Sequence, residues 1–141
     1  MTIEEIGKQI AAEFELFDDW MDKYNYLIEL GKGLPLIEES KKKPENLIVG
    51  CQSKVWINAE YNQGMLTYQA DSDAIITKGL VSLLLRAVNG HTPDEIMLAD
   101  LSFLDNTGLK EHLSPTRSNG LVSMVKQVKY YAMAFKAKEQ A

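Results

Sequence analysis

Apolar residues in the first part of the chain recur at helical spacing. Thr2 and Glu5 have the arrangement of a capping box, which predicts a helix over residues 3–15. A second helix is expected to start at a cap, Asp18 or Asp19, and to end at the glycines that follow it. The apolar residues on the inner faces of these helices are Ile3, Ile6, Ile10, Trp20, Tyr24, Leu27 and Ile28. The pattern therefore predicts an N-terminal helical hairpin, followed by a solvated loop over residues 32–46.

Alternation replaces helical spacing in the middle of the chain. Residues 51–60 alternate between two faces, residues 62–64 have turn composition, and a second β segment is expected at 65–70. One face carries Cys51, Ser53, Val55, Ile57 and Ala59. The other face places Trp56 among polar residues, so we expect it to be only partly covered. These features predict an antiparallel hairpin.

Helical spacing returns after the hairpin. Residues 71–73 offer caps for a helix that continues through Val88, and Thr92 begins a short helix that ends near Leu98. After an irregular stretch, a long helix is expected from about residue 115. The predicted inner faces comprise Ile75, Ile76, Leu80, Leu83, Leu84 and Val88 in the first of these helices, and Leu121, Met124, Val125, Val128, Ala132 and Phe135 in the last. Helices that precede and follow a small antiparallel sheet along the chain define an α+β fold.

Composition limits the class of protein. The 141 residues are 45% hydrophobic and 25% charged, which predicts one globular domain over residues 1–141. A net charge of -5 opposes binding to nucleic acid. No window has the roughly 20 apolar residues of a membrane span, and the first residues lack a secretory signal pattern, so no membrane association is expected. We expect a cytoplasmic protein.

Thiol chemistry is the chemistry that the sequence offers. Cys51 is the single cysteine, and His91 and His112 are not spaced as metal ligands with it, which argues against structural zinc, haem or a complete iron–sulfur ligand set in one chain. Phosphate-binding loops and esterase motifs are also missing from the sequence. Gly50 permits a sharp bend that would present Cys51, but a lone cysteine is also often a small buried hydrophobe. Residue chemistry alone leaves both alternatives open.

Five stretches of the sequence resemble the SufE family of sulfur-acceptor proteins. The resemblance is carried by residues 48–57 (IVGCQSKVWI), 23–31 (KYNYLIELG), 71–74 with 78–80 (DSDA and KGL), 92–93 (TP) and 112–121 (HLSPTRSNGL). It implies a fold similar to the scaffold protein IscU, with a small curved antiparallel sheet and helices packed around it. It also implies that Cys51 accepts sulfur from a pyridoxal-phosphate cysteine desulfurase of the SufS or CsdA type and passes it towards a SufBCD-type scaffold. The chain would then be the sulfur-carrying partner of an enzyme, with no cofactor of its own, and not a free-standing enzyme.

The resemblance further implies supporting roles around Cys51. Arg117 could lower the thiol pKa, grip an acidic group of the partner, or brace the loop before the last helix. Asp73 could tune how tightly the Cys51 loop is held, although a carboxylate at a helix start is also simply stabilising. Gln52 could donate and accept hydrogen bonds beside the thiol. The apolar neighbours Val55 and Ile57 would shelter the thiol until the partner docks.

Two other functions compete with the sulfur carrier. A thiol redox protein with one cysteine would use Cys51 against peroxides or disulfides, but the sequence has neither a resolving cysteine nor a Cys-x-x-Cys motif. A non-catalytic adaptor or cluster scaffold would need cluster ligands from another chain. The sulfur carrier is therefore the hypothesis that the sequence favours.

Overall fold

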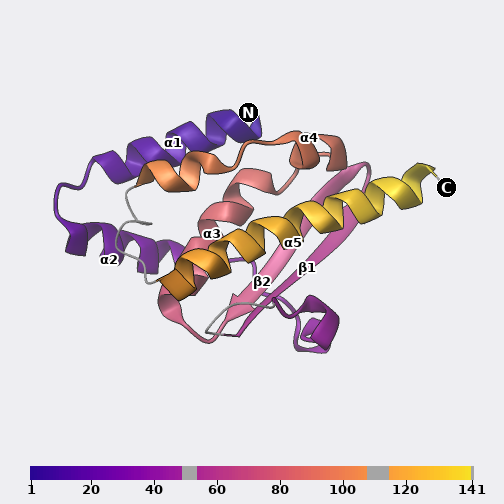
Figure 1. Cartoon of the computed structure of the whole chain (residues 1–141), viewed down its shortest axis with the longest axis horizontal. Helices are drawn as coiled ribbons and strands as arrows, with labels where there is room; N and C mark the ends of the chain where they lie inside the picture. Colours follow the sequence, from indigo (N-terminus) through magenta and orange to yellow (C-terminus); the bar gives the residue numbers. More distant parts are fainter. Residues whose placement is uncertain (49–53, 108–114, 141) are drawn as a thin grey trace.

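The computed structural model of the chain describes residues 1–48, 54–107 and 115–140 (Figure 1). Its helices and strands are α1 (Ile3–Glu15), α2 (Trp20–Gly31), β1 (Val55–Asn62), β2 (Met65–Ser72), α3 (Ile75–Val88), α4 (Pro93–Leu98) and α5 (Pro115–Gln140). Short 3-10 turns lie at Glu39–Lys41, Pro44–Asn46 and Ser102–Thr107, so the two stretches expected to be irregular contain local turns of helix. The α+β architecture predicted from the sequence is confirmed.

The two strands form the predicted antiparallel hairpin. Their register runs from Val55 opposite Ser72 to Asn62 opposite Met65. The connection has two residues in the left-handed region, Gln63 with φ 53° and Gly64 with φ 83°, which matches the twist of adjacent strands. Both strands extend two residues beyond the predicted ends. The strand was predicted to begin at residue 51, but β1 begins at Val55 and Lys54 is not part of it. The predicted strand residues 51–53 lie outside the described residues.

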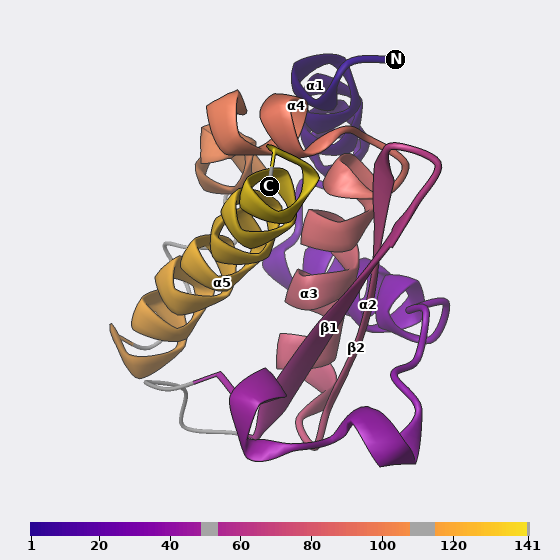
Figure 2. The ribbon, with the colours of Figure 1, turned by 90° about the vertical axis from the view of Figure 1, so that its right-hand side faces the viewer.

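The hydrophobic core lies against one face of the hairpin. The buried strand residues are Val55, Ile57, Ala59, Leu66, Tyr68 and Ala70. α3 packs against β2, and α5 contacts β1 and α3, an arrangement that Figure 2 shows with α3 along the hairpin and α5 beside it. On the opposite face Trp56 and Asn58 are half-buried and Glu60 is exposed, so the predicted partial cover of this face is confirmed.

Helix α3 is the centre of the fold, since it contacts α1, α2, β2 and α5. The predicted apolar face is correct for its buried leucines and Val88, but Ile75 is 63% exposed. Ile75 opens the helix, beyond the part that neighbouring elements cover. Val81, Leu85 and Ala87 are fully buried as well. They are buried because neighbouring elements cover α3 on several sides, whereas an amphipathic helix is covered on one.

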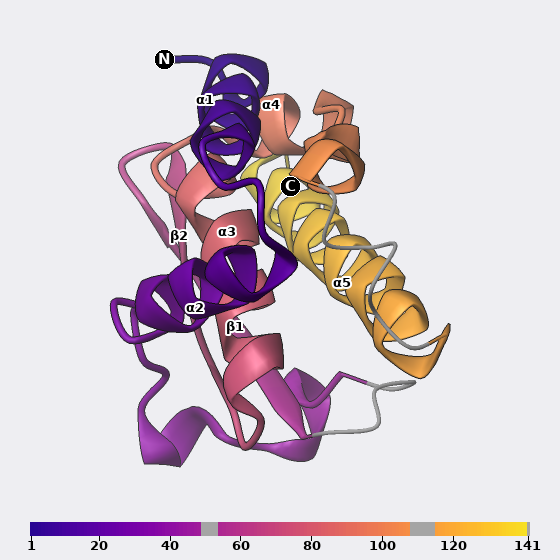
Figure 3. The ribbon, with the colours of Figure 1, turned by 90° about the vertical axis from the view of Figure 1, so that its left-hand side faces the viewer.

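A close approach of two glycines sets the crossing of α2 and α3, which Figure 3 shows. A Cβ atom at Gly31 would lie 3.0 Å from the backbone nitrogen of Gly79, and one at Gly79 would lie 2.5 Å from the carbonyl oxygen of Leu27. Backbone meets backbone at this crossing, so side chains of ordinary size do not fit between the helices.

Helix starts follow the predicted capping chemistry in three places and depart from it in one. Thr2 with Glu5, and Thr92 with Glu95, each form a complete capping box, and the Asp19 side chain accepts a hydrogen bond from the Met21 amide at the start of α2. The expected cap of α3 by residues 71–73 is only partly right. The N-cap position is Ala74, with no side-chain cap on the helix, and the Ser72 hydroxyl accepts from the Ala74 amide.

An ion pair joins the first helix to the central one. Arg86 donates to both carboxylate oxygens of Glu13 at 2.8 and 2.6 Å, and the Tyr26 hydroxyl also donates to Glu13. The hydrogen bonds from Arg86, helped by Tyr26, outweigh burial and hold the pKa of the Glu13 carboxyl below its ordinary value of 4.5. A carboxyl whose pKa is lower in the folded chain than in the unfolded chain stabilises the fold at pH values above its ordinary pKa.

We expect Glu13→Gln to lose about 1 kcal/mol of unfolding free energy at neutral pH, because the pair is partly exposed to solvent. The difference from the parent should vanish as the pH falls through the lowered pKa of Glu13 in the folded state. Denaturant unfolding at several pH values measures it. Glu29→Gln removes the exposed pair with Lys32 and is the control, expected to change nothing measurable. A difference that persists in acid would contradict this account.

Candidate functional site

The segment that carries Cys51 connects two paired stretches of backbone. Gly50, Cys51 and Gln52 lie outside the described residues, but both ends of the segment are described. The Ile48 amide donates to the Val55 carbonyl at 2.8 Å, and Leu47 pairs with Trp56 in an antiparallel bridge. Residues 49–54 therefore link two neighbouring antiparallel stretches, with Cys51 within that link.

Asp73 lies at the other end of this link. Its carboxylate accepts a hydrogen bond from the Lys54 amide at 3.1 Å, and its own amide donates to the Lys54 carbonyl at 3.3 Å. The Asp73 side chain makes no cap hydrogen bond to α3, since it bonds to the residue before β1. Asp73 nevertheless directly precedes the N-cap Ala74, so its charge lies at the helix start, as the alternative explanation expected. This exposed carboxylate fixes the chain three residues after Cys51.

Loss of the Asp73 carboxylate should loosen that end of the link. We expect Asp73→Ala to raise the alkylation rate of Cys51 by about threefold, as loss of one hydrogen bond of modest net strength implies, with little change in melting temperature. Asp100→Ala is the matched control, because Asp100 also accepts from a backbone amide, that of Ser102, outside this region. Equal alkylation rates in the parent and both variants would reduce Asp73 to a residue without influence on the thiol.

Asp71 also has a different role from the predicted cap. It binds the ammonium groups of Lys42 at 2.9 Å and Lys78 at 3.3 Å. Burial alone would raise the pKa of Asp71, but hydrogen bonds from Lys42, the Ser72 amide and Lys78 outweigh it and lower that pKa. The Lys42 ammonium also lies 5.2 Å from the centroid of the Trp56 ring. This cluster holds the loop before Leu47 against the hairpin.

Arg117 is placed by its backbone only. It lies in the first turn of α5, as the sequence predicted, and its side chain lies outside the described residues. In both side views the beginning of α5 lies at the same end of the molecule as the start of β1 (Figures 2 and 3). A groove of about 370 Å³ between Leu47, Ile48 and the side chains of Ser123, Lys126, Gln127 and Tyr130 separates α5 from the stretch that precedes Cys51.

Asn46 and Tyr131 connect that stretch to α5, and sequence reasoning missed both. The Tyr131 hydroxyl donates to the side-chain oxygen of Asn46. Asn46 belongs to the loop predicted to be solvated, and Tyr131 lies just beside the apolar stripe predicted for α5. The one available signal was an aromatic residue next to that stripe, and it does not identify a partner.

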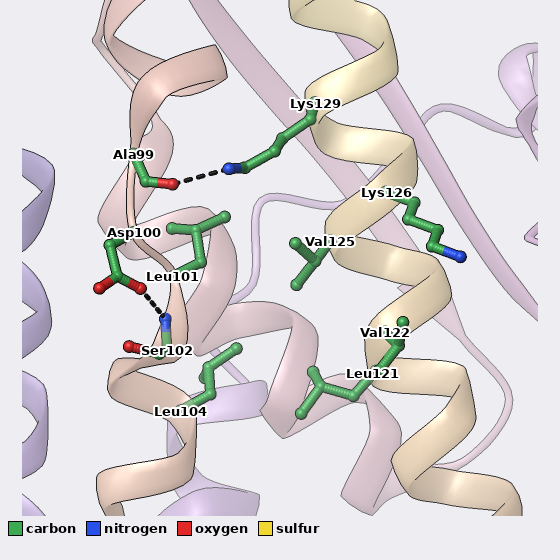
Figure 4. A pocket seen from close by; sticks show the side chains of 10 residues that line it. All are labelled: Ala99, Asp100, Leu101, Ser102, Leu104, Leu121, Val122, Val125, Lys126 and Lys129. Atoms are coloured by element: carbon green, nitrogen blue, oxygen red, sulfur yellow. Dashed lines mark hydrogen bonds between the residues drawn. The ribbon is translucent and has the colours of Figure 1, made fainter.

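A second cleft, of about 390 Å³, lies between residues 99–104 and α5 (Figure 4). Leu101, Leu104 and Val125 form apolar walls, while the Lys129 ammonium crosses the cleft to donate to the Ala99 carbonyl at 2.7 Å. The Lys129 ammonium thus joins the two walls of the cleft. Neither a thiol nor a histidine is among the described residues that line the cleft.

The hydrogen-bond partners of His91 do not lie at the described ends of the Cys51 link. His91 is buried, and its ring nitrogens face the carbonyl oxygens of Val88, Asn89 and Met1. It therefore fixes the end of α3 to the N-terminus, as a cap does. His112 lies outside the described residues.

Comparison with known proteins identifies the family. Residues 8–132 match SufE, described as an Fe-S metabolism associated domain. The chain belongs to the SufE family. It is 42% identical over 126 residues to an uncharacterized SufE-like protein of Rhizobium etli, covering 86% of this chain and 85% of that one. It is 40% identical over 126 residues to an uncharacterized SufE-like protein of Rhizobium meliloti, covering 86% of this chain and 90% of the other.

The fold is also found in a solved structure. A hypothetical protein from Thermus thermophilus aligns with a TM-score of 0.76 at 18% identity, over 92% of this chain and 94% of that one. This similarity concerns the fold alone. Membership of the SufE family confirms the resemblance seen in the sequence and implies a sulfur-transfer role in iron–sulfur metabolism. Across the residues that the structure describes, no helix combines the length and apolar character needed to cross a membrane.

Proposed function

We propose that this SufE-family chain accepts sulfur from a cysteine desulfurase of the SufS or CsdA type in the cytoplasm, stimulates that enzyme, and relays the sulfur to a SufBCD-type scaffold. The observation that supports this proposal most strongly is the anchoring of both ends of the segment that contains the single thiol. Cys51 belongs to a link whose two ends are held by backbone bonds, Ile48 to Val55 and Lys54 to Asp73. The segment that carries the thiol is thus fixed to the rest of the fold at each end.

The transfer is a thiol–disulfide type exchange. The Cys51 thiol gives its proton to solvent, and the thiolate attacks the outer sulfur of the persulfide on the desulfurase cysteine. A bond forms between Cys51 Sγ and that outer sulfur, while the sulfur–sulfur bond of the donor breaks. The donor cysteine leaves as a thiolate and is free for another turnover. The number of persulfides is unchanged, so the step needs no added oxidant or reductant.

The residues around Cys51 serve this exchange. Gly50 gives the backbone freedom to present the thiol, and Gln52 offers a donor and an acceptor beside it. Asp73 restrains the downstream end through Lys54. Arg117 either stabilises the thiolate or binds an acidic group of the desulfurase through paired hydrogen bonds. The variant Arg117→Lys distinguishes these two roles, because lysine keeps the positive charge but cannot form the paired hydrogen bonds of a planar guanidinium.

The function is tested by adding increasing amounts of the chain to a desulfurase and measuring alanine release from free cysteine. We expect stimulation that saturates with the concentration of this chain, because an acceptor clears the enzyme's persulfide. Protein whose thiol has been blocked by alkylation beforehand is the control and should give no stimulation. Unchanged alanine release with desulfurases of both types would overturn the proposal.

A further inference from the structure

Asn46 is a buried polar side chain in a stretch otherwise rich in exposed charge. It is 6% exposed, two residues before Ile48 and five before Cys51. Its side-chain nitrogen donates to the Lys41 carbonyl at 2.7 Å, and its side-chain oxygen accepts from the Tyr131 hydroxyl. Both ends of the amide are thus occupied, one within its own loop and one on α5. A buried polar group that is fully bonded holds its position, because losing either bond is costly.

Tyr131 ties this loop to two other elements. Its hydroxyl lies 3.1 Å from the Ile57 carbonyl of β1 as well as beside Asn46. Burial raises the pKa of Tyr131, so the hydroxyl keeps its proton and remains a donor at neutral pH. Its ring contacts Tyr68 edge-on, with centroids 6.5 Å apart. The hydroxyl therefore joins α5, β1 and the stretch before Cys51 at one point.

The position of this junction connects it to the thiol. On the downstream side the link to Cys51 is held by Asp73, and on the upstream side Ile48 bonds to Val55. The upstream bond is backbone to backbone and sets only the pairing. The Asn46 side chain adds the connection to α5, the helix whose first turn carries Arg117. This contact therefore links the upstream end of the Cys51 link directly to α5.

We propose that Asn46 and Tyr131 are positioning residues for sulfur acceptance, which fix the upstream end of the Cys51 link relative to α5. The proposal rests on the proposed function of Cys51 as the acceptor. Neither side chain takes part in bond exchange. They act through the chain that carries the thiol, and so they determine how readily the thiol is reached.

The test is the alkylation rate of Cys51 in Tyr131→Phe, which removes the hydroxyl and keeps the ring. We expect alkylation to be faster by about three- to tenfold, the factor that loss of one ordinary hydrogen bond corresponds to. Asn46→Ala, which removes the other partner, should change the rate in the same direction. In desulfurase activation, both variants should shift the concentration that gives half-maximal stimulation.

Two tyrosines serve as matched controls. Tyr68→Phe removes another buried hydroxyl, which donates to the Val128 carbonyl at 2.8 Å and does not bond to the described ends of the Cys51 link. It should lower the melting temperature as much as Tyr131→Phe does and leave alkylation unchanged. Tyr130→Phe removes the hydroxyl of a neighbour that is 58% exposed and should change neither.

Parent-like alkylation in both Tyr131→Phe and Asn46→Ala would overturn the positioning role, and so would equal acceleration in Tyr68→Phe. Alkylation requires no desulfurase, so its outcome is separate from the fate of the proposed function. If the parent chain failed to stimulate any desulfurase while Tyr131→Phe still exposed the thiol, the acceptor role would fall and the positioning of Cys51 would stand.

Discussion

Cys51→Ser should abolish sulfur acceptance and all stimulation of the desulfurase. Cys51 is the only thiol of the chain, so no second cysteine can take over. A serine hydroxyl cannot form a persulfide, while its volume is close to that of cysteine and the fold should persist. Alanine release in the presence of the variant should equal that of the desulfurase alone, and the melting temperature should stay near the parent value.

The matched control for this variant is Ser53→Ala, two residues along the same segment, which keeps the thiol. It should stimulate the desulfurase like the parent. If Cys51→Ser stimulated alanine release as well as the parent does, stimulation would come from docking alone and Cys51 would not be the acceptor.

Gly79→Ala should be the most destabilising small substitution in the described core. A methyl group there would lie 2.5 Å from the Leu27 carbonyl oxygen and 2.7 Å from Leu27 Cγ. In an unconstrained helix, exchange of glycine for alanine gains about 1 kcal/mol. Here the backbone of α2 must move away, so we expect a net loss of about 3 kcal/mol, at the upper end of overpacking penalties. Denaturant unfolding measures the difference.

Gly33→Ala is the control for this prediction, because a methyl group at Gly33 would meet nothing nearer than the Leu30 carbonyl at 3.6 Å. It should change the unfolding free energy by less than about 1 kcal/mol. If the two variants were equally stable, the close crossing of α2 and α3 would not be the reason for glycine at position 79.

Local chemistry made much of this fold predictable from the sequence. The capping boxes at Thr2 and Thr92 and the hairpin turn at Gln63 and Gly64 each depend on residues a few positions apart, and each occurs as expected. Amphipathic spacing likewise predicted α5 and its inner face.

Features that depend on contacts between distant segments were not predictable in this way. Asp73 is a residue type that commonly caps helices, yet its carboxylate accepts a hydrogen bond from the amide of Lys54, nineteen residues earlier. The contact of Asn46 with Tyr131 joins residues 85 positions apart, and no spacing rule connects them. Ile75 fits the apolar period of α3 but lies where neighbouring elements do not cover it. Periodicity gives the orientation of a side chain on its own helix and not what the rest of the chain places against it.

The candidate site shows the same division. Uniqueness of the thiol and the resemblance of its flanking residues to the SufE family are enough to single out Cys51 from the sequence alone. The backbone bonds that anchor the two ends of its segment, and the contacts that reach those ends from Asp73 and from α5, depend on how distant parts of the chain fold together.

The measurement that tests sulfur acceptance most directly is the intact mass of the chain after incubation with a cysteine desulfurase and free cysteine, followed by peptide mapping. We expect a gain of one sulfur atom on the peptide that contains Cys51, reversed by a thiol reductant and missing when cysteine or the desulfurase is left out. An unchanged mass under conditions in which the desulfurase turns over would contradict sulfur acceptance by this chain.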